Sequence, residues 1–167
     1  PYQHMVKTQA LENAFEQISG DLSIKEVILS GGDPLILDDQ QLVSIFKSLQ
    51  QIKHVERIRI HSRLPIVLPS RVTKQFITLM RDTSLKTSLV VHVNHPNELD
   101  NLTIESLRKC KESGLILLNQ SVLLKNINNN VDTLTKLSEV LFSAGVLPYY
   151  LHLLDRVTGA AHFEVSD

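Results

Sequence analysis

Short apolar runs recur along the chain at intervals of about thirty residues, and polar side chains follow each run. The runs are 26–29, 57–60, 89–91, 115–118 and 147–151. They are rich in Val, Ile and Leu, which is typical of strands buried on both faces of a parallel sheet. In such a sheet the polar residues after all five runs lie at one rim, which is where α/β proteins of this kind bind ligands.

Segments with helical periodicity separate the runs. Leu42, Ile45, Phe46 and Leu49 follow i, i+3, i+4, i+7 spacing, after acidic residues at 38–39 that favour a helix start. Residues 11–18, 73–80, 103–112 and 131–144 are the other predicted helices, with Gly20, Gly114 and Gly145 placed to end three of them.

Alternation of strands and amphipathic helices predicts right-handed βαβ units and a parallel sheet. Such a chain forms either an open doubly wound sheet or an arc of a barrel. The polar groups at every strand end, without hairpins, favour the arc: a partial TIM-type barrel of about five parallel βα units, with a further strand before the first helix. Its exposed sheet edges favour association into a homo-oligomer.

The composition argues against several classes of protein. The chain has 167 residues, 43% hydrophobic and 21% charged, which is enough for one globular domain with a real core. A net charge of −1 argues against a dedicated nucleic-acid or membrane surface. There is no run long enough to span a membrane and no signal peptide, so we expect a cytoplasmic location.

The single cysteine, Cys110, cannot form an internal disulfide or hold an iron–sulfur cluster alone. It follows Leu107 in a helical apolar pattern, so we expect a buried structural thiol. The chain starts at Pro1 instead of methionine, and we expect residues 1–167 to be the central part of a longer protein.

The segment Ser30-Gly31-Gly32-Asp33-Pro34 is the sharpest local feature. Two glycines at a strand end let a ligand approach the backbone, whose N–H groups can hold a carboxylate. The Asp33 carboxylate beside them can hold an ammonium, and the combination suits an amino-acid moiety. A tight turn with Asp33 capping the next helix fits the same residues, and both interpretations stay open.

The second and third strand ends also carry candidate groups. Ser62 and Arg63 offer donors for a phosphate or carboxylate. His92 and Asn94 share one face of a strand, and a pair that hydrogen-bonds toward a cofactor is favoured over a metal site with His95. Arg71, farther along, is interpreted as structural or surface.

At the fourth strand end, Asn119, Gln120 and Ser121 suit the hydroxyls of a nucleoside. The asparagines at 128–130 indicate a turn and nothing more. Asp155, after the fifth strand, either binds a substrate ammonium or simply ends the strand. Nothing in the chain has the pattern of a nucleophile, and Lys25 precedes its strand, at the wrong end for an aldolase lysine.

Several blocks in fixed order resemble the lysine 2,3-aminomutases of the radical S-adenosylmethionine (SAM) superfamily. These blocks are 30–35, 60–65, 68–73, 92–98, 119–124 and 148–163. Residues 149–152 with 159–163 resemble the branch that makes (R)-β-lysine for modifying elongation factor P. The resemblance covers essentially the whole chain.

The resemblance implies roles for matched positions. Asp155 corresponds to an acid that binds the ε-ammonium of lysine. The residues that it implies for SAM binding are Ser30, Gly31, Gly32, Asp33, Ser62, Arg63, His92 and Gln120. It also implies a [4Fe–4S] cluster and pyridoxal phosphate (PLP), which together with SAM move the amino group of lysine from C2 to C3.

The departures from the family pattern limit what this segment is expected to do. The Cys-x-x-x-Cys-x-x-Cys motif of the cluster is absent, and residues 1–3 resemble the stretch just after it. The family's PLP lysine corresponds to a position beyond Asp167. We therefore expect no catalytic residue and no metal site in this segment, and no activity of the segment alone. The alternative is a non-catalytic domain that binds a small amino-acid or nucleotide ligand.

Overall fold

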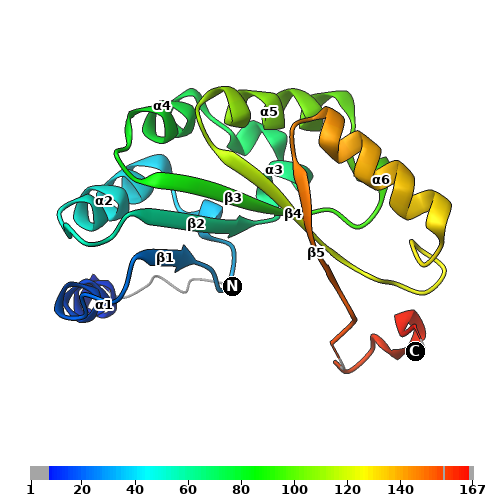
Figure 1. The fold of residues 1–167 in the computed structure, drawn as a ribbon, viewed down its shortest axis with the longest axis horizontal. Coiled ribbons are helices and arrows are strands. Elements are labelled where there is room, and N and C mark those ends of the chain that lie inside the picture. Colours follow the sequence, from blue (N-terminus) through cyan, green and yellow to red (C-terminus); the bar gives the residue numbers. More distant parts are fainter. Residues whose placement is uncertain (1–7, 156, 166–167) are drawn as a thin grey trace.

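The protein is an arc of five parallel strands with helices along its outer side (Figure 1). A computed structural model describes residues 8–155 and 157–165. The strands pair in the order β1-β2-β3-β4-β5. They are β1 Glu26–Leu29, β2 Arg57–Ser62, β3 Lys86–His92, β4 Ile116–Val122 and β5 Leu147–His152. The longer helices are α1 Thr8–Gly20, α2 Asp39–Gln50, α4 Lys74–Asp82, α5 Asn101–Glu112 and α6 Val131–Ser143.

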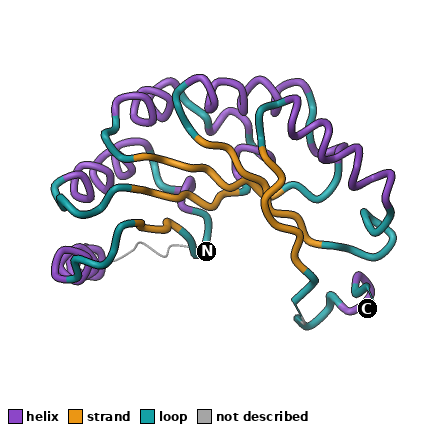
Figure 2. Tube along the Cα trace, in the orientation of Figure 1, coloured by secondary structure: helices purple, strands orange, loops and turns teal. Residues whose placement is uncertain are grey.

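This architecture confirms the predicted fold class. All four strand pairs are parallel, and β1 and β5 are the two edges of an open sheet rather than neighbours in a closed barrel. Figure 2 shows the strands as one curved layer under a layer of helices. The segment at 1–3 whose resemblance suggested a preceding cluster motif lies outside the described residues, as does any strand before α1.

Helix boundaries follow from capping groups. Asp38 caps α2 in a box with Gln41, Asp100 caps α5 and Asn130 caps α6, each by accepting from a backbone N–H of the first turn. Gly114 and Gly145 have φ values of 94° and 80° just after α5 and α6, as the sequence predicted for helix ends.

The segment after β2 is helical rather than an irregular turn. It forms α3 (Leu64–Val67) and then the 3-10 turn η2 (Pro69–Arg71), with Pro65 and Pro69 near the two starts. A proline in the first helical turn has no N–H to leave unpaired, which is why two prolines here start helices.

The helix-covered face of the sheet carries the apolar core. Ile58, Ile60, Leu89, Val91 and Leu117 alternate along the strands and are almost fully buried against the helices. Cys110 of α5 is also fully buried in this core, and burial raises the pKa of its thiol to about 12. The prediction of a buried structural cysteine is confirmed.

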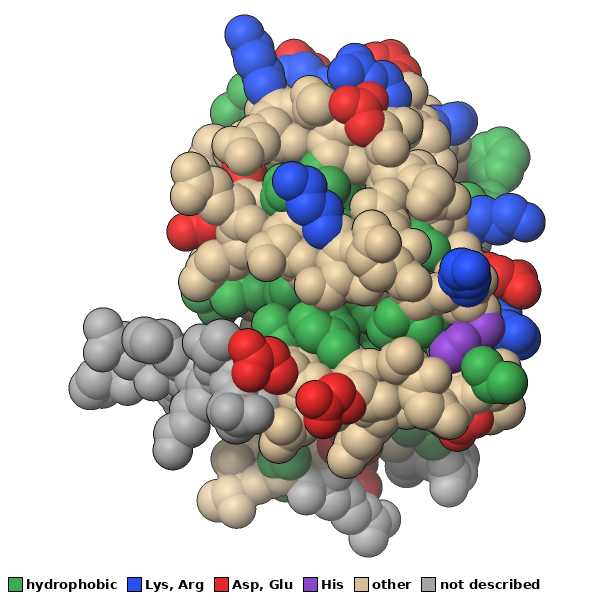
Figure 3. Space-filling view, turned by 90° about the vertical axis from the view of Figure 1, so that its left-hand side faces the viewer, with side chains coloured by type: hydrophobic (Ala, Val, Ile, Leu, Met, Phe, Trp, Pro, Cys, Tyr) green, Lys and Arg blue, Asp and Glu red, His purple; other side chains and the backbone are tan. Residues whose placement is uncertain are grey.

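The ends of the arc are less well covered. Every residue of β5 is exposed, and a register shift beside Asn119 and Gln120 leaves Tyr149 as an extra residue in that strand. At the other end, His54 Nε2 pairs with the Ile18 carbonyl at 2.9 Å and ties α1 to the loop before β2. Figure 3 shows a band of hydrophobic side chains on this end, where β1 forms the sheet edge.

Among the described residues, no helix has the length and apolar character needed to cross a bilayer.

Candidate functional site

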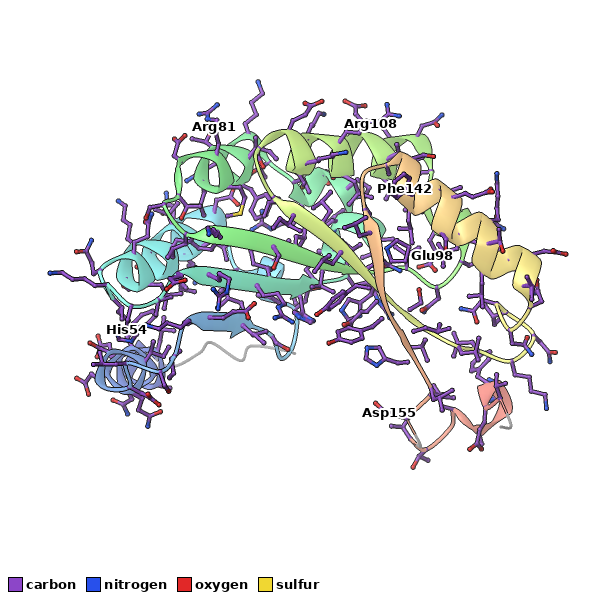
Figure 4. All side chains as sticks on the ribbon, viewed as in Figure 1. His54, Arg81, Glu98, Arg108, Phe142 and Asp155 are labelled. Carbon is purple, nitrogen blue, oxygen red and sulfur yellow. The ribbon has the colours of Figure 1, made fainter. Side chains whose placement is uncertain are left out.

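The inner face of the arc, opposite the core, is polar near the strand ends. Strand alternation places Arg59 and His61 of β2, His92 of β3 and Gln120 of β4 on this face, each between the buried residues that face the helices. Figure 4 shows side chains projecting from the concave side of the sheet, away from the helices. Side chains from β2, β3 and β4 therefore share one face of the sheet near the strand ends.

The β1 end is open to a ligand at its glycines. Gly31 and Gly32 have φ values of 82° and 62°, in the left-handed region that side chains rarely adopt. A Cβ built on either glycine meets no atom within 4 Å, so the space beside this backbone is free. The geometry permits the close approach of a ligand to this backbone, and which ligand binds there stays a prediction.

The carboxylate of Asp33 is occupied by the protein itself. Its Oδ1 accepts hydrogen bonds from the backbone N–H of Leu35 at 3.0 Å and from Ser62 Oγ at 2.6 Å. Its Oδ2 accepts from the N–H groups of Arg63 at 2.7 Å and Leu64 at 3.3 Å. A carboxylate has about four lone-pair sites, and all are used here. The capping interpretation of Asp33 is confirmed, and its contact with a ligand ammonium stays a prediction.

Ser62 and Arg63, predicted together as lining residues, have different surroundings. Ser62 is 2% exposed on the helix-facing side of β2, and its hydroxyl donates to Asp33 and accepts from the Leu64 N–H. Arg63 has an exposed side chain, whose charge acts on His92. Of the two, only Arg63 presents a group that is free to meet a ligand.

His92 and Gln120 form the centre of the inner face. They pair across β3 and β4, and Gln120 Nε2 lies 2.7 Å from His92 Nε2 and 3.1 Å from its Nδ1. Burial lowers the pKa of His92, and the positive charge of Arg63 acts in the same direction. The imidazole is therefore neutral at pH 7.

His61 and Arg59 were not among the predicted binding residues. The His61 and His92 rings meet edge to face, with centroids 6.4 Å apart. Burial, followed by the charge of Arg59, lowers the pKa of His61. Arg59 donates two hydrogen bonds to Glu26 Oε1, at 2.9 and 2.8 Å. The alternation of polar residues in Arg57–Ser62 was the signal that would have placed both side chains on the inner face.

Asn119 and Ser121, expected to face a nucleoside, lie instead on the opposite face of the sheet. They are 1% and 6% exposed, on the helix-facing side of β4. Asn119 accepts from the Val93 N–H and donates to the Val93 carbonyl, and Ser121 donates to that same carbonyl. Because neighbouring strand residues face opposite sides, only Gln120 of this trio reaches the inner face.

The turn at 128–130 also joins two strand ends by hydrogen bonds, which the sequence did not suggest. Asn128 is fully buried, donates to the carbonyls of Asn94 and Val122, and accepts from the Leu124 N–H. Asn94 in turn accepts from the Val122 N–H. These amides lock the ends of β3 and β4 together.

The metal interpretation, already disfavoured, gains no support. His95 Nδ1 accepts from the Asn97 N–H, and Glu98 accepts from the N–H groups of Asn94 and His95. Within the described residues, no group of three His, Cys, Asp or Glu side chains is placed to hold a metal ion.

Arg71 is structural, as interpreted from the sequence. Its guanidinium donates to Asp39 Oδ1 and to the carbonyls of Leu35 and Leu37, which joins η2 to the segment before α2.

Asp155 lies beyond β5, apart from the middle of the sheet (Figure 4). Its side chain is exposed, with no hydrogen bond or ion pair from another described residue. It lines a cavity of about 420 Å³ together with Leu154, Val157, Ala160, Ala161 and Glu164.

Comparison with known proteins gives a consistent result. The chain is 49% identical to an L-lysine 2,3-aminomutase of Haemophilus influenzae, over 92% of this chain and 46% of that protein. It is 47% identical to the L-lysine 2,3-aminomutase of Escherichia coli, over 93% and 46%. A Buchnera aphidicola L-lysine 2,3-aminomutase is 44% identical over 100% of this chain and 49% of its own length. The chain belongs to the lysine 2,3-aminomutase family.

This family member spans about half the length of the relatives it matches. No protein-family model matches the chain. Among solved structures, a tropomodulin C-terminal domain from Caenorhabditis elegans aligns over 91% of this chain and 87% of its own, with a TM-score of 0.33 and 16% identity. That similarity is too low to bear on the fold or the function of the chain.

Proposed function

We propose that residues 1–167 are the central part of the partial barrel of a radical SAM, PLP-dependent L-lysine 2,3-aminomutase. The observation that carries the proposal is the 49% identity over 92% of the chain to a protein of that name. The proposed activity of the full natural protein is isomerisation of L-lysine to (R)-β-lysine in the cytoplasm. The resemblance of residues 149–152 and 159–163 to one branch supports elongation factor P as the destination of the product.

Several groups on the rim support SAM binding by this chain. The open backbone at Gly31 and Gly32 suits the amino-acid end of SAM, and the exposed Arg63 lies nearby to meet a carboxylate. In this proposal Ser30 contributes backbone, while Asp33 and Ser62 fix the loop. His92 and Gln120 offer neutral hydrogen-bonding groups farther along the same face. When bound, SAM supplies the radical chemistry of the family.

Asp155 is the proposed partner of the lysine ε-ammonium. Its carboxylate is exposed beside a cavity, with no cation among the described side chains bonded to it. A substrate ammonium therefore meets an anion that the described part of the chain leaves unpaired.

The described residues offer no site for an iron–sulfur cluster, and the family resemblance assigns the PLP lysine to a position beyond Asp167. The chain's one cysteine is buried in the core, and the described residues hold no three-ligand group for a cluster. We therefore propose that the cluster ligands and the PLP lysine belong to other parts of the full protein, and that the isolated segment is inactive.

The test compares the full natural protein with the isolated segment 1–167. Each is reconstituted with iron, sulfide and PLP, then incubated with L-lysine, SAM and a strong reductant, and β-lysine is measured by mass spectrometry. We expect β-lysine from the full protein only. Turnover by the isolated segment contradicts the claim of inactivity. A full protein that binds lysine or SAM without turnover favours the alternative, a non-catalytic binding domain.

A further inference from the structure

The segment 30–33, called the glycine loop below, has little to hold it in place by itself. Gly31 and Gly32 are exposed, and their N–H groups donate to no other described residue. Adjacent glycines have wide conformational freedom, so a ligand that orders a loose loop of this kind does so at a large cost in entropy. A single conformation of the loop therefore requires that both of its ends be fixed.

The first end of the loop is fixed by the sheet, and the second by hydrogen bonds from distant residues. Leu29, before the loop, pairs with Ile60 of β2. After Asp33 the chain forms the 3-10 turn η1 (Pro34–Ile36). The guanidinium of Arg71, in η2, donates to the carbonyl of Leu35 through Nε and to the carbonyl of Leu37 at 2.7 Å through Nη2. Arg71 thus holds the chain directly after the loop.

Arg71 is itself held rigidly. Its Nη1 donates to Asp39 Oδ1 at 2.7 Å, and the two side chains are only 12% and 13% exposed. The other oxygen of Asp39 accepts from Thr73, which caps α4 by accepting from the Phe76 N–H. The guanidinium also lies 5.9 Å from the centre of the Phe76 ring. The turn after the glycine loop is therefore tied to the starts of both α2 and α4.

This arrangement depends on the shape of the guanidinium. Arg71 serves three acceptors in different directions with three nitrogens of one planar group. A lysine ammonium is a point charge on a flexible chain and does not reproduce that fork. Charge alone is therefore not sufficient at position 71.

We propose that Arg71 is a positioning residue for SAM binding. By holding the carbonyls of Leu35 and Leu37, it keeps the glycine loop in the conformation that receives the amino-acid end of SAM, without touching the ligand. The loop is then ordered before the ligand arrives, which strengthens binding. The inference rests on the proposed function, which assigns SAM to this loop. It gives a functional role to a residue that the sequence indicated as structural or surface.

The main experiment uses Arg71→Lys in the reconstituted full natural protein. We expect SAM to bind about tenfold more weakly in titration calorimetry, which corresponds to ordering roughly one further residue on binding. The KM for lysine at saturating SAM should stay within about twofold, because Asp155 lies beyond β5 at the other end of the arc. Arg81→Lys is the matched control, since Arg81 of α4 pairs with its exposed neighbour Asp82 (Figure 4), and neither value should change.

Hydrogen–deuterium exchange of the same proteins without SAM separates positioning from a general loss of stability. The backbone N–H groups of residues 35–37 are hydrogen-bonded to Asp33 and Pro34. In Arg71→Lys we expect these groups to exchange faster, while those of residues 89–91 in β3 keep the wild-type rate. Global destabilisation would accelerate exchange in both segments.

Several results would overturn the proposal. Unchanged SAM affinity of Arg71→Lys shows that Arg71 positions nothing for SAM, and weakening of SAM and lysine together, or faster exchange throughout the sheet, shows a purely structural role. A wild-type protein that does not bind SAM refutes the proposed function, whereas the exchange rates still show whether Arg71 orders the turn. If Arg71→Lys does not fold, Asp39→Asn, which removes the charge that holds Arg71, must weaken SAM binding selectively, and unchanged affinity there overturns the proposal.

Discussion

Asp33 and Asp155 are carboxylates at opposite ends of the same rim, and they have opposite surroundings. Asp33 accepts four hydrogen bonds, two of them from the backbone after β2, and thereby joins the ends of two strands. Asp155 is exposed and accepts none from the described side chains. The β1–β2 end of the rim is thus joined by hydrogen bonds within the chain, whereas the carboxylate at the β5 end has no partner among the described side chains.

The largest loss of stability is expected from Asp33→Asn. In either orientation of the new amide, its NH2 group would face a backbone N–H donor, that of Leu35 or those of Arg63 and Leu64, and it cannot accept from them. We expect a loss of about 3 kcal/mol in the free energy of unfolding of the full protein, measured in urea, because charged hydrogen bonds are broken and donors are left unpaired. SAM binding should be lost with the loop geometry.

Asp38→Asn is the matched control, because Asp38 caps α2 and asparagine caps helices about as well as aspartate. We expect a change within about 0.5 kcal/mol for this variant. If Asp33→Asn costs no more than Asp38→Asn, Asp33 is merely a cap and the contrast with Asp155 disappears.

Asp155→Asn should leave stability unchanged, within about 0.5 kcal/mol, because the carboxylate has no partner to lose. The KM for lysine should rise by about tenfold or more, as expected for one charge-assisted hydrogen bond to an ammonium. Asp132→Asn, a change on the surface of α6, is the control. An unchanged KM in steady-state assays of the full protein would remove Asp155 from the substrate site.

The sequence was sufficient for the fold because its signals are periodic. Apolar runs and helical spacing gave all five strands and five longer helices, and Gly114 and Gly145 marked two helix ends. The sequence did not show which face of the sheet each side chain at a strand end would occupy. Asn119, Gln120 and Ser121 were equally plausible ligand-binding residues until the pleat of β4 showed that two of them face the helices.

The sequence also did not predict hydrogen bonds between residues that lie far apart along the chain. Asn128 looked like a turn residue, yet its amide holds the Asn94 and Val122 carbonyls, and Ser62 looked like a lining residue although it binds Asp33. Local patterns do not reveal which distant backbone groups a polar side chain will satisfy. His61 was missed although the alternation of polar residues in β2 would have placed it on the inner face.

A smaller effect is expected from Ser62→Ala, which removes one of the four donors to Asp33 and keeps the others. We expect a loss of about 1 kcal/mol in urea unfolding, the usual net contribution of one hydrogen bond. Ser88→Ala, on the inner face of β3, should change stability by less than about 0.5 kcal/mol. Equal effects of the two variants would show that the hydrogen bond from Ser62 to Asp33 does not stabilise the fold.

The two histidines in the middle of the rim, between the two carboxylates, should make stability depend on pH. The pKa values of His61 and His92 in the folded state lie below the ordinary 6.5, chiefly because of burial. Below pH 6.5 the unfolded chain therefore binds more protons than the folded one, so stability is full above 6.5 and declines as the pH falls toward the folded values. The slope is at most about 1.4 kcal/mol per pH unit for each histidine.

The pH range in which the histidines change stability is separate from the range of the carboxylates. The pKa values of Asp21, Asp100 and Glu105 are lowered, mainly by hydrogen bonds from Ser23, Thr103 and Lys109, so their contributions are lost only in stronger acid. Urea unfolding at pH 7, 6 and 5 should show declining stability in the wild type and a shallower decline in His92→Gln, which does not titrate. A variant slope as steep as the wild-type slope would show that His92 is not held neutral by the inner face. The middle of the rim would then resemble the exposed Asp155 end rather than the preformed Asp33 end.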